Sequence, residues 1–223
     1  MQKKVLITGG NRGVGLALVN RFLSEGFQVL ATSRSGKIET VNHPNLSVFA
    51  LEITSSTAVA NLVSSLKEQF GSIDFLINNA GVGLDLDKYQ PEIDVVKATF
   101  ETNVFGLLNF TEACLDLIND NGTIFNISSV MGMLNREKII PNATAYRMSK
   151  SALNMYTKTL SARLQERNIK VLSIHPGWVK TDMGGQEADI TPEFSANGIF
   201  ELYQKDLPTG TFWAADNQME LNW

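Results

Sequence analysis

The stretch Thr8-Gly9-Gly10-Asn11-Arg12-Gly13-Val14-Gly15 decides the fold of this chain. It follows an apolar run of strand length, Lys4–Thr8, and leads into a stretch of helical periodicity, Val14–Glu25. Between strand and helix, the glycines at positions 9, 13 and 15 let the chain turn tightly and bring backbone N–H groups to a diphosphate at the helix N-terminus. The stretch therefore predicts a dinucleotide-binding loop, and a strand-to-helix turn without a ligand is the alternative.

The same alternation continues along the chain. Apolar runs of strand length alternate with longer helical stretches, which is typical of βαβ units that build a parallel sheet covered on both faces. We expect an α/β fold of one domain over residues 1–223, Rossmann-type and doubly wound, with a mainly parallel seven-stranded sheet flanked by helices on both faces. The expected strands are Lys4–Thr8, Gln28–Thr32, Ser47–Leu51, Phe75–Asn78, Gly122–Ile127, Lys170–His175 and Gly210–Ala214. The expected helices are Val14–Glu25, Ser56–Phe70, Glu92–Ile118, Ala143–Arg167 and a shorter one near Ser195–Lys205.

Composition and charge exclude several classes of protein. With 43% hydrophobic and 19% charged residues, the composition of the chain is typical of a globular protein. A formal net charge of -4 gives no basic footprint for nucleic acid or anionic lipid, so we expect no nucleic acid and no membrane as partners. Cys114 is the only cysteine, which excludes an intrachain disulfide and a thiolate metal cluster, and we expect no metal site. The first apolar run meets glycines too early for a signal core or a membrane span, which predicts a cytoplasmic protein.

The end of the second strand indicates which dinucleotide is bound. An NAD-binding domain usually offers Asp or Glu there to the adenosine ribose, but no acidic residue lies between Glu25 and Glu39. Instead Ser33 and Arg34 follow the strand, and Arg12 lies in the glycine loop, so that two guanidinium groups are placed to hold a 2′-phosphate. We predict NADP(H) as the cofactor, and solvated surface arginines are the alternative.

Two side chains with acid–base chemistry share a helix face. Tyr146 and Lys150 are four residues apart in the long helix that begins near Ala143. A phenol has a pKa near ~10, and a cation held beside it is expected to lower that pKa. Upstream, Ser128 and Ser129 end the fifth strand, where ligands of open α/β sheets bind, and a hydroxyl there can hold a substrate oxygen.

Taken in order, these motifs resemble those of the short-chain dehydrogenase/reductase family. The family's pattern is matched by the glycine loop, by Asn78-Asn79-Ala80-Gly81, by Tyr146-Arg147-Met148-Ser149-Lys150 and by Pro176-Gly177-Trp178-Val179-Lys180-Thr181. Within the family, the whole chain is similar to the sniffer-type carbonyl reductases and the related C-factor proteins. The resemblance implies four catalytic residues: Asn103, Ser129, Tyr146 and Lys150.

The resemblance also implies what each catalytic residue does. Ser129, the second serine of its pair, would hold the substrate oxygen, and Tyr146 would protonate it. Lys150 would tune the phenol and bind the nicotinamide ribose. Asn103 would hold a water that links Lys150 to solvent, and a polar residue that merely kinks its helix is the alternative interpretation.

The cofactor contacts follow from the same resemblance. Glu52 matches the family's acidic residue near the adenine, although Asp is commoner there. Thr181 would hold the nicotinamide carboxamide and so fix which face of the ring is presented. The implied cofactor-binding residues are Gly9, Asn11, Arg12, Gly13, Val14, Gly15, Ser33, Arg34, Glu52, Ile53, Asn79, Ala80, Gly81, Tyr146, Lys150, Pro176, Gly177, Val179, Thr181 and Met183.

Two segments near the site depart from regular structure. The interval from Ser129 to Tyr146 is 17 residues, a few more than is common in the family, so we expect a longer loop over the pocket that includes Asn135–Asn142. The segment Gly177–Pro192 is the least regular and is a candidate mobile lid. His175, at a strand end, is expected to be packed or hydrogen-bonded and not catalytic.

The resemblance implies an NADPH-dependent carbonyl reductase that transfers hydride to an aldehyde, ketone or quinone carbonyl, with Tyr146 as general acid and a small molecule as substrate. Two alternatives stay open: an NADP(H)-binding sensor or signalling protein of C-factor type with little turnover, and an alcohol dehydrogenase working in the oxidative direction. The two long expected helices, Glu92–Ile118 and Ala143–Arg167, correspond to those through which relatives dimerise as a four-helix bundle. We therefore expect a homodimer.

Overall fold

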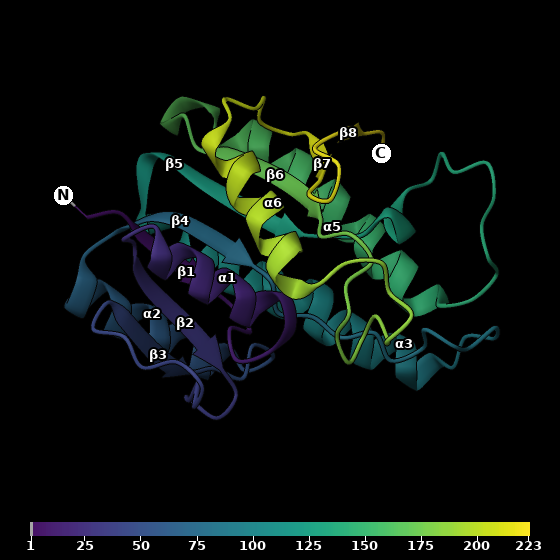
Figure 1. The fold of residues 1–223 in the computed structure, drawn as a ribbon, viewed down its shortest axis with the longest axis horizontal. Helices are drawn as coiled ribbons and strands as arrows, with labels where there is room; N and C mark the ends of the chain where they lie inside the picture. Colours follow the sequence, from purple (N-terminus) through teal and green to yellow (C-terminus); the bar gives the residue numbers. More distant parts are fainter. Residues whose placement is uncertain (1) are drawn as a thin grey trace.

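Within residues 2–223, eight strands form one sheet in the order β3-β2-β1-β4-β5-β6-β7-β8 (Figure 1). The computed structural model describes residues 2–223. The strands are β1 (Lys4–Ile7), β2 (Gln28–Ser33), β3 (Leu46–Ala50), β4 (Ile73–Asn78), β5 (Ile118–Ile127), β6 (Lys170–His175), β7 (Phe212–Ala214) and β8 (Glu220–Leu221). All neighbours pair in parallel except β7 and β8. The prediction of an α/β, doubly wound fold is confirmed. The sheet has one strand more than the seven predicted, because β8 has only two residues and is too short to give a periodic pattern in the sequence.

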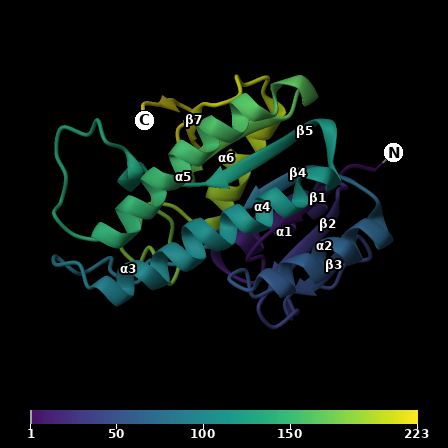
Figure 2. The ribbon, with the colours of Figure 1, turned by 180° about the vertical axis from the view of Figure 1, so that it is seen from behind.

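Helices cover both faces of the sheet. Figure 1 shows α1 and α6 in front of the strands, and Figure 2, from behind, shows α2, α4 and α5 over the other face. The helices are α1 (Gly13–Ser24), α2 (Ser56–Phe70), α3 (Ile93–Phe100), α4 (Leu107–Cys114), α5 (Thr144–Arg163) and α6 (Pro192–Gln204). In the sequence Val5-Leu6-Ile7, the outer two residues pack with α1 and α6, and Leu6 packs with α2, α4 and α5. This alternation of side chains is what makes both faces of a parallel sheet apolar.

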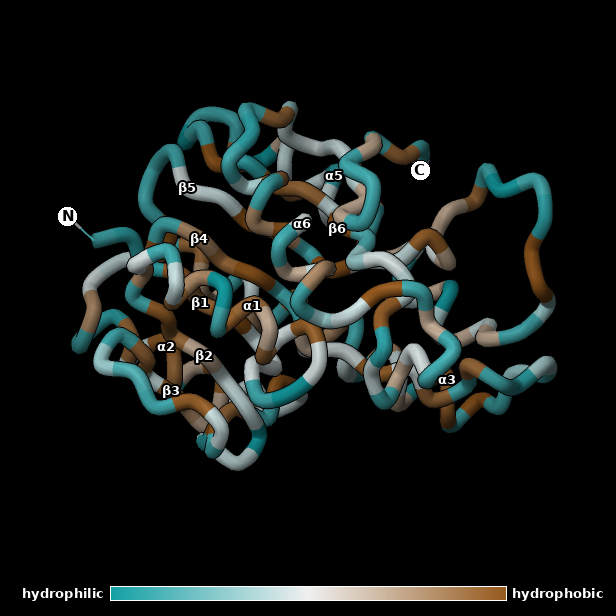
Figure 3. The backbone as a smooth tube through the Cα atoms, in the orientation of Figure 1, coloured by the Kyte–Doolittle hydropathy of each residue, from teal (hydrophilic) through white to brown (hydrophobic). Residues whose placement is uncertain are grey.

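Figure 3 shows the consequence for the distribution of hydrophobic residues. The central strands are largely brown, and the connecting loops are mostly hydrophilic. None of the helices within residues 2–223 combines the length and the apolar character that crossing a membrane requires.

The predicted helix Glu92–Ile118 is wrong in two respects. It is interrupted by a π-helical turn, Glu101–Gly106, and it ends in a 3₁₀ turn, Leu115–Leu117, so that Ile118 already belongs to β5. Asn103 lies inside the π turn and makes hydrogen bonds to the backbone of Val82. These tertiary bonds accompany the irregular turn, and such turns often occur at functional positions.

The ends of two other helices differ from prediction. Helix α5 stops at Arg163, and a 3₁₀ turn replaces its predicted last residues. Helix α6 begins three residues before the predicted Ser195, because the Thr191 hydroxyl accepts a hydrogen bond from Phe194 N and Pro192 occupies the first turn.

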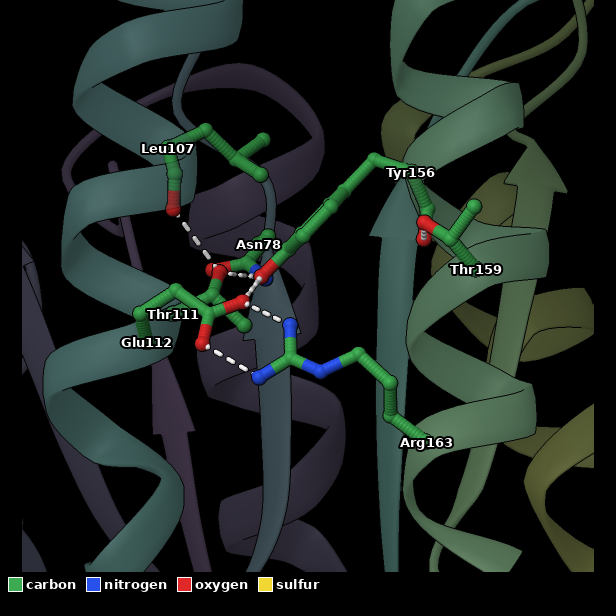
Figure 4. A network of polar contacts seen from close by, with 7 residues as sticks. All are labelled: Asn78, Leu107, Thr111, Glu112, Tyr156, Thr159 and Arg163. Carbon is green, nitrogen blue, oxygen red and sulfur yellow. Dashed lines mark hydrogen bonds and ion pairs between the residues drawn. The ribbon is translucent and has the colours of Figure 1, made fainter.

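A network of polar contacts holds α4 against α5 (Figure 4). The Glu112 carboxylate accepts hydrogen bonds from both terminal nitrogens of Arg163, at 2.7 and 2.9 Å, and from the Tyr156 hydroxyl at 2.8 Å. Beneath them, the Asn78 amide of β4 donates to the Thr111 hydroxyl at 2.9 Å. The arginine lowers the pKa of Glu112 by its hydrogen bond. These contacts fix the position of α5, which carries Tyr146 and Lys150.

Candidate active site

Three predicted catalytic side chains meet at the carboxyl edge of the sheet. Ser129 follows β5, and Tyr146 and Lys150 lie in the first two turns of α5; all three are buried. The Ser129 hydroxyl accepts a hydrogen bond from Met131 N at 3.1 Å and lies near enough to the Tyr146 phenol to act on its pKa. The Lys150 ammonium lies 5.5 Å from the centroid of the Tyr146 ring and donates a hydrogen bond to the Ile127 carbonyl oxygen at 2.8 Å. The structure therefore brings an acid, a hydroxyl and a cation together.

Burial controls the electrostatics of this cluster. Burial raises the pKa of Tyr146 to about 12, although the neighbouring Ser129 hydroxyl acts in the opposite direction. Burial also lowers the pKa of Lys150 to about 8, because a buried ammonium loses its hydration. Loss of solvent therefore dominates the pKa of the phenol, and the expected lowering of that pKa by Lys150 stays a prediction.

Asn103 lies close to this cluster. A Cβ atom built on Gly81 would lie 3.2 Å from the Asn103 amide oxygen and 3.7 Å from the Lys150 nitrogen. The Asn103 oxygen accepts a hydrogen bond from Val82 N at 2.8 Å, and its nitrogen donates to Val82 O at 2.8 Å and to the Ser149 hydroxyl at 3.1 Å. The side chain thus anchors the segment after β4, and its predicted role in holding a water stays a prediction.

The glycine loop is held by the segment after β4. The Asn79 amide donates hydrogen bonds to the carbonyl oxygens of Thr8, at 2.9 Å, and Gly9, at 3.1 Å. The Thr8 hydroxyl accepts hydrogen bonds from the backbone N–H groups of Asn79 and Ala80, both at 3.0 Å. A Cβ on Gly15 would overlap the Gly9 carbonyl oxygen and crowd the Asn79 amide, so this position requires glycine.

The N-terminus of α1 has the properties of an anion site. Among the described residues, Arg12 occupies the N-cap position, and its side chain makes no capping hydrogen bond. The first turn of α1 contains no acidic residue. Its first N–H groups are therefore available to a negatively charged group, which the helix dipole also favours. Gly13, Val14 and Gly15 form that first turn, next to Asn11 in the loop.

Of the residues predicted to bind the adenosine end of the cofactor, Arg12, Ser33 and Glu52 have ion-pair or hydrogen-bond partners within the protein. Arg12 forms an ion pair with Asp182 at 2.7 Å, whereas Arg34 is exposed just beyond β2. The Ser33 hydroxyl bonds to the backbone N–H and carbonyl of Lys37, both at 3.0 Å, and so closes its own loop. In the loop after β3, the exposed Glu52 accepts a hydrogen bond from the Thr54 hydroxyl at 3.0 Å, next to buried Ile53.

The segment after β6 folds over the glycine loop. A bridge joins Val179 to Ile190, and the Thr181 hydroxyl accepts a hydrogen bond from Gly184 N at 3.1 Å. A Cβ on Gly13 would lie 3.1 Å from the Thr181 methyl carbon, so the two loops are in contact. The expected irregular lid is thus internally hydrogen-bonded, and Pro192 belongs to α6. Pro176 and Gly177 lie at its beginning, directly after β6, and the half-exposed Met183 lies between them and Ile190.

The long loop before α5 does not cover this edge as predicted. Residues 134–141 are exposed, and the loop between β5 and α5 projects away from the body in Figures 1 and 2. His175 is packed, and burial lowers its pKa to about 4. A cavity of about 610 Å³ opens at the opposite, amino edge of the sheet, beside Phe125 and Leu172, and its walls contain none of the predicted site residues.

The sequence patterns missed one residue at the site. Asp85 is only 2% exposed, and its carboxylate accepts hydrogen bonds from Ala145 N at 2.7 Å and from Tyr146 N at 3.2 Å. It lies in a loop 60 residues before the helix that it contacts. The local sequence gives no sign of this contact, because neither periodicity nor a family motif marks the position.

Comparison with known proteins agrees with this geometry. Residues 3–190 match the family model of the short chain dehydrogenases, so the chain belongs to that family of oxidoreductases. It is 34% identical over 194 residues to the dehydrogenase/reductase SDR family protein 7-like of Anopheles gambiae, a match that covers 80% of this chain and 60% of that relative. The family resemblance expected from the motifs is therefore confirmed.

Two solved structures share the whole fold. The carbonyl reductase Sniffer of Drosophila melanogaster superimposes with a TM-score of 0.91 at 29% identity, covering all of both chains. The NADPH-bound carbonyl reductase from chicken fatty liver gives a TM-score of 0.92 at 29% identity, covering 100% of this chain and 94% of that one.

Proposed function

We propose that this oxidoreductase is an NADPH-dependent carbonyl reductase that reduces an aldehyde, ketone or quinone, with Tyr146 as the general acid. The observation that carries the proposal is the cluster of buried Ser129, Tyr146 and Lys150 at the carboxyl edge of the sheet. A hydroxyl that can give up its proton, next to a second hydroxyl that can donate a hydrogen bond, is what a carbonyl oxygen needs when it gains negative charge.

The residues present fit an NADP(H) molecule. The uncapped first turn of α1 suits the diphosphate, and Arg12 and Arg34 suit a 2′-phosphate. Thr181 would hold the carboxamide, and Lys150 the nicotinamide ribose. The chicken structure, which contains NADPH, supports this choice by its similarity over the whole chain.

The protein's own residues perform the protonation. The hydride comes from the nicotinamide ring when the cofactor is bound. Ser129 donates a hydrogen bond from its hydroxyl to the carbonyl oxygen, and Tyr146 transfers its phenolic proton to that oxygen as the C=O bond becomes C–OH. The charge of Lys150 stabilises the phenolate that remains, and Asn103 fixes the segment beside it.

A homodimer is part of the proposal. Phe105, beside α4, and Met148 and Met155, on α5, are exposed apolar side chains, at 56%, 49% and 63%. Pairing of these helices in two copies would bury them, as a four-helix bundle does. Light scattering after size exclusion tests this: a monomer at micromolar concentration would contradict it.

The function is tested by following NADPH oxidation with a panel of aldehydes, ketones and quinones. Tyr146→Phe removes the proton donor with little change of shape and is expected to lower kcat by about 10²- to 10⁴-fold while NADPH binding remains. Tyr89→Phe, at an exposed tyrosine, is the matched control and should keep wild-type activity.

The same measurements separate the alternatives. Wild-type protein that binds NADPH but turns over none of the panel is a sensor and not a reductase. A protein that oxidises alcohols with NADP⁺ and reduces no carbonyl is a dehydrogenase that works in the oxidative direction. Full activity of Tyr146→Phe would remove the assigned role of the phenol.

A further inference from the structure

The carboxylate of Asp85 is buried without forming an ion pair. Its side chain is 2% exposed, and none of the salt bridges formed within residues 2–223 includes it. A buried charge is costly unless hydrogen bonds replace its hydration. Asp85 obtains them from the backbone N–H groups of Ala145 and Tyr146, at 2.7 and 3.2 Å. Its position is therefore tied to the start of α5.

Helix α5 relies on this distant residue for its N-terminal cap. The residue before the helix, Ala143, has a left-handed backbone with φ of 57° and makes no side-chain capping bond. Unpaired N–H groups in the first turn would otherwise face a protein interior, and a carboxylate there is favoured by the helix dipole. Asp85 therefore replaces a local cap, and one of the N–H groups it binds belongs to Tyr146 itself.

The loop that carries Asp85 is fixed at several points. Asn103 binds both backbone groups of Val82, each at 2.8 Å. At the other end, the Asn142 amide donates to Leu86 O at 2.7 Å, and Ala143 N donates to Lys88 O at 2.9 Å. The loop is thus held between the π turn and the start of α5. Asp85 therefore lies in a loop that is held in place, and its hydrogen bonds connect the first turn of α5 to that loop.

We propose that Asp85 is a positioning residue for the proton donor: it holds the backbone of Tyr146 so that the phenol lies at the Ser129 hydroxyl. The proposal rests on the reductase function proposed above. It assigns Asp85 no contact with substrate or cofactor. A displacement of about 1 Å of a reacting group can reduce the rate about 10²-fold, so a backbone anchor at the acid has a measurable effect.

The test is Asp85→Asn, which keeps the size of the side chain but removes its charge and turns one acceptor into a donor that faces an N–H group. We expect kcat per NADPH-binding site to fall about tenfold or more, because the phenol is misaligned. The KM for the carbonyl and the Kd for NADPH should change less than about twofold, since Asp85 contacts neither ligand. The solvent deuterium isotope effect on kcat should increase, because proton transfer becomes slower. Asp87→Asn, an exposed neighbour in the same loop, is the control and should behave as wild type.

A purely structural role predicts a different result. If Asp85 only stabilises the fold, Asp85→Asn lowers the melting temperature and the number of binding sites, but kcat per site and the isotope effect stay at wild-type values. That result would overturn the proposal. Should Asp85→Asn fail to fold, Asp85→Ser, which retains one acceptor oxygen, is measured in the same way and should show the same increase in isotope effect.

A crystal structure of the Asp85 variant gives a readout that needs no turnover. The proposal predicts that the Tyr146 hydroxyl moves away from the Ser129 hydroxyl relative to its place in the wild-type protein, and an unmoved phenol would overturn it. If wild-type protein reduces no carbonyl, the proposed function fails, yet this structure still decides whether Asp85 positions Tyr146. The failures of the two proposals are therefore distinguishable.

Discussion

The Lys150 ammonium lies 5.5 Å from the centroid of the Tyr146 ring, and burial moves the pKa values of the two groups in opposite directions. Tyr146 has a pKa of about 12 and Lys150 a pKa of about 8. As the pH rises through the mildly alkaline range, the phenol keeps its proton and the ammonium loses its own. Of the two groups, Lys150 is therefore the one that should set the alkaline limit of activity.

The first prediction concerns this limit. With saturating NADPH, kcat for carbonyl reduction should fall as the pH rises past about 8, because the neutral lysine no longer stabilises the phenolate. Lys150→Arg keeps a positive charge throughout, so its kcat, although lower, should be constant over the same range. The measurement is a pH profile of kcat for both proteins. An identical alkaline fall in Lys150→Arg would show that another group titrates.

Local patterns were sufficient to predict the glycine loop and the pair Tyr146 and Lys150. Strand, turn and helix follow each other there in sequence, and the helical period places residues four apart on one face. The sheet edge at which Ser129 lies follows from the order of the elements. These features depend on neighbouring residues, which is why the sequence alone reveals them.

The remaining features depend on packing between distant segments. Asp85 caps α5 from 60 residues away, and the π turn at Asn103 accompanies bonds to Val82. The raised pKa of Tyr146 results from burial, which no spacing of residues records. The pairing of Arg12 with Asp182 likewise joins segments 170 residues apart. Sequence patterns have no access to such contacts.

The second prediction concerns the choice of cofactor. Arg34→Ser should raise the Kd for NADPH about tenfold or more and leave the Kd for NADH nearly unchanged, because a hydrogen bond to a charged phosphate contributes about 1.5–3 kcal/mol. Arg34 is a cleaner target than Ser33, whose hydroxyl closes its loop by bonds to Lys37. Fluorescence titration with both cofactors provides the measurement.

Lys67→Ser serves as the control for the loss of one positive charge, because Lys67 is exposed on α2. It should change neither Kd. Equal weakening of NADPH and NADH by Arg34→Ser would mean that the guanidinium stacks on the adenine and does not bind the 2′-phosphate.

The third prediction concerns stability at acid pH. Burial lowers the pKa of His175 from 6.5 to about 4. Between these values the unfolded chain binds a proton that the folded protein does not, so the free energy of unfolding decreases as the pH falls from 6.5 to about 4. His175→Asn should reduce this decrease. Urea unfolding at a series of pH values measures it, with His43→Asn as the matched substitution of the other histidine, and equal slopes for wild type and His175→Asn would contradict the prediction.

The last prediction concerns Asp182, which pairs with Arg12 at 2.7 Å. The pair is exposed, so it contributes at most about 1 kcal/mol, and a phosphate can replace the carboxylate. If Arg12 binds the 2′-phosphate, Asp182 competes with that phosphate for the same guanidinium and repels it. Asp182→Asn should therefore lower the Kd for NADPH by up to about fivefold and affect NADH less, since NADH lacks the 2′-phosphate. Glu187→Gln removes a charge from the same loop and should have no such effect. Weaker binding of both cofactors by Asp182→Asn would instead show that the ion pair closes the loop over the dinucleotide.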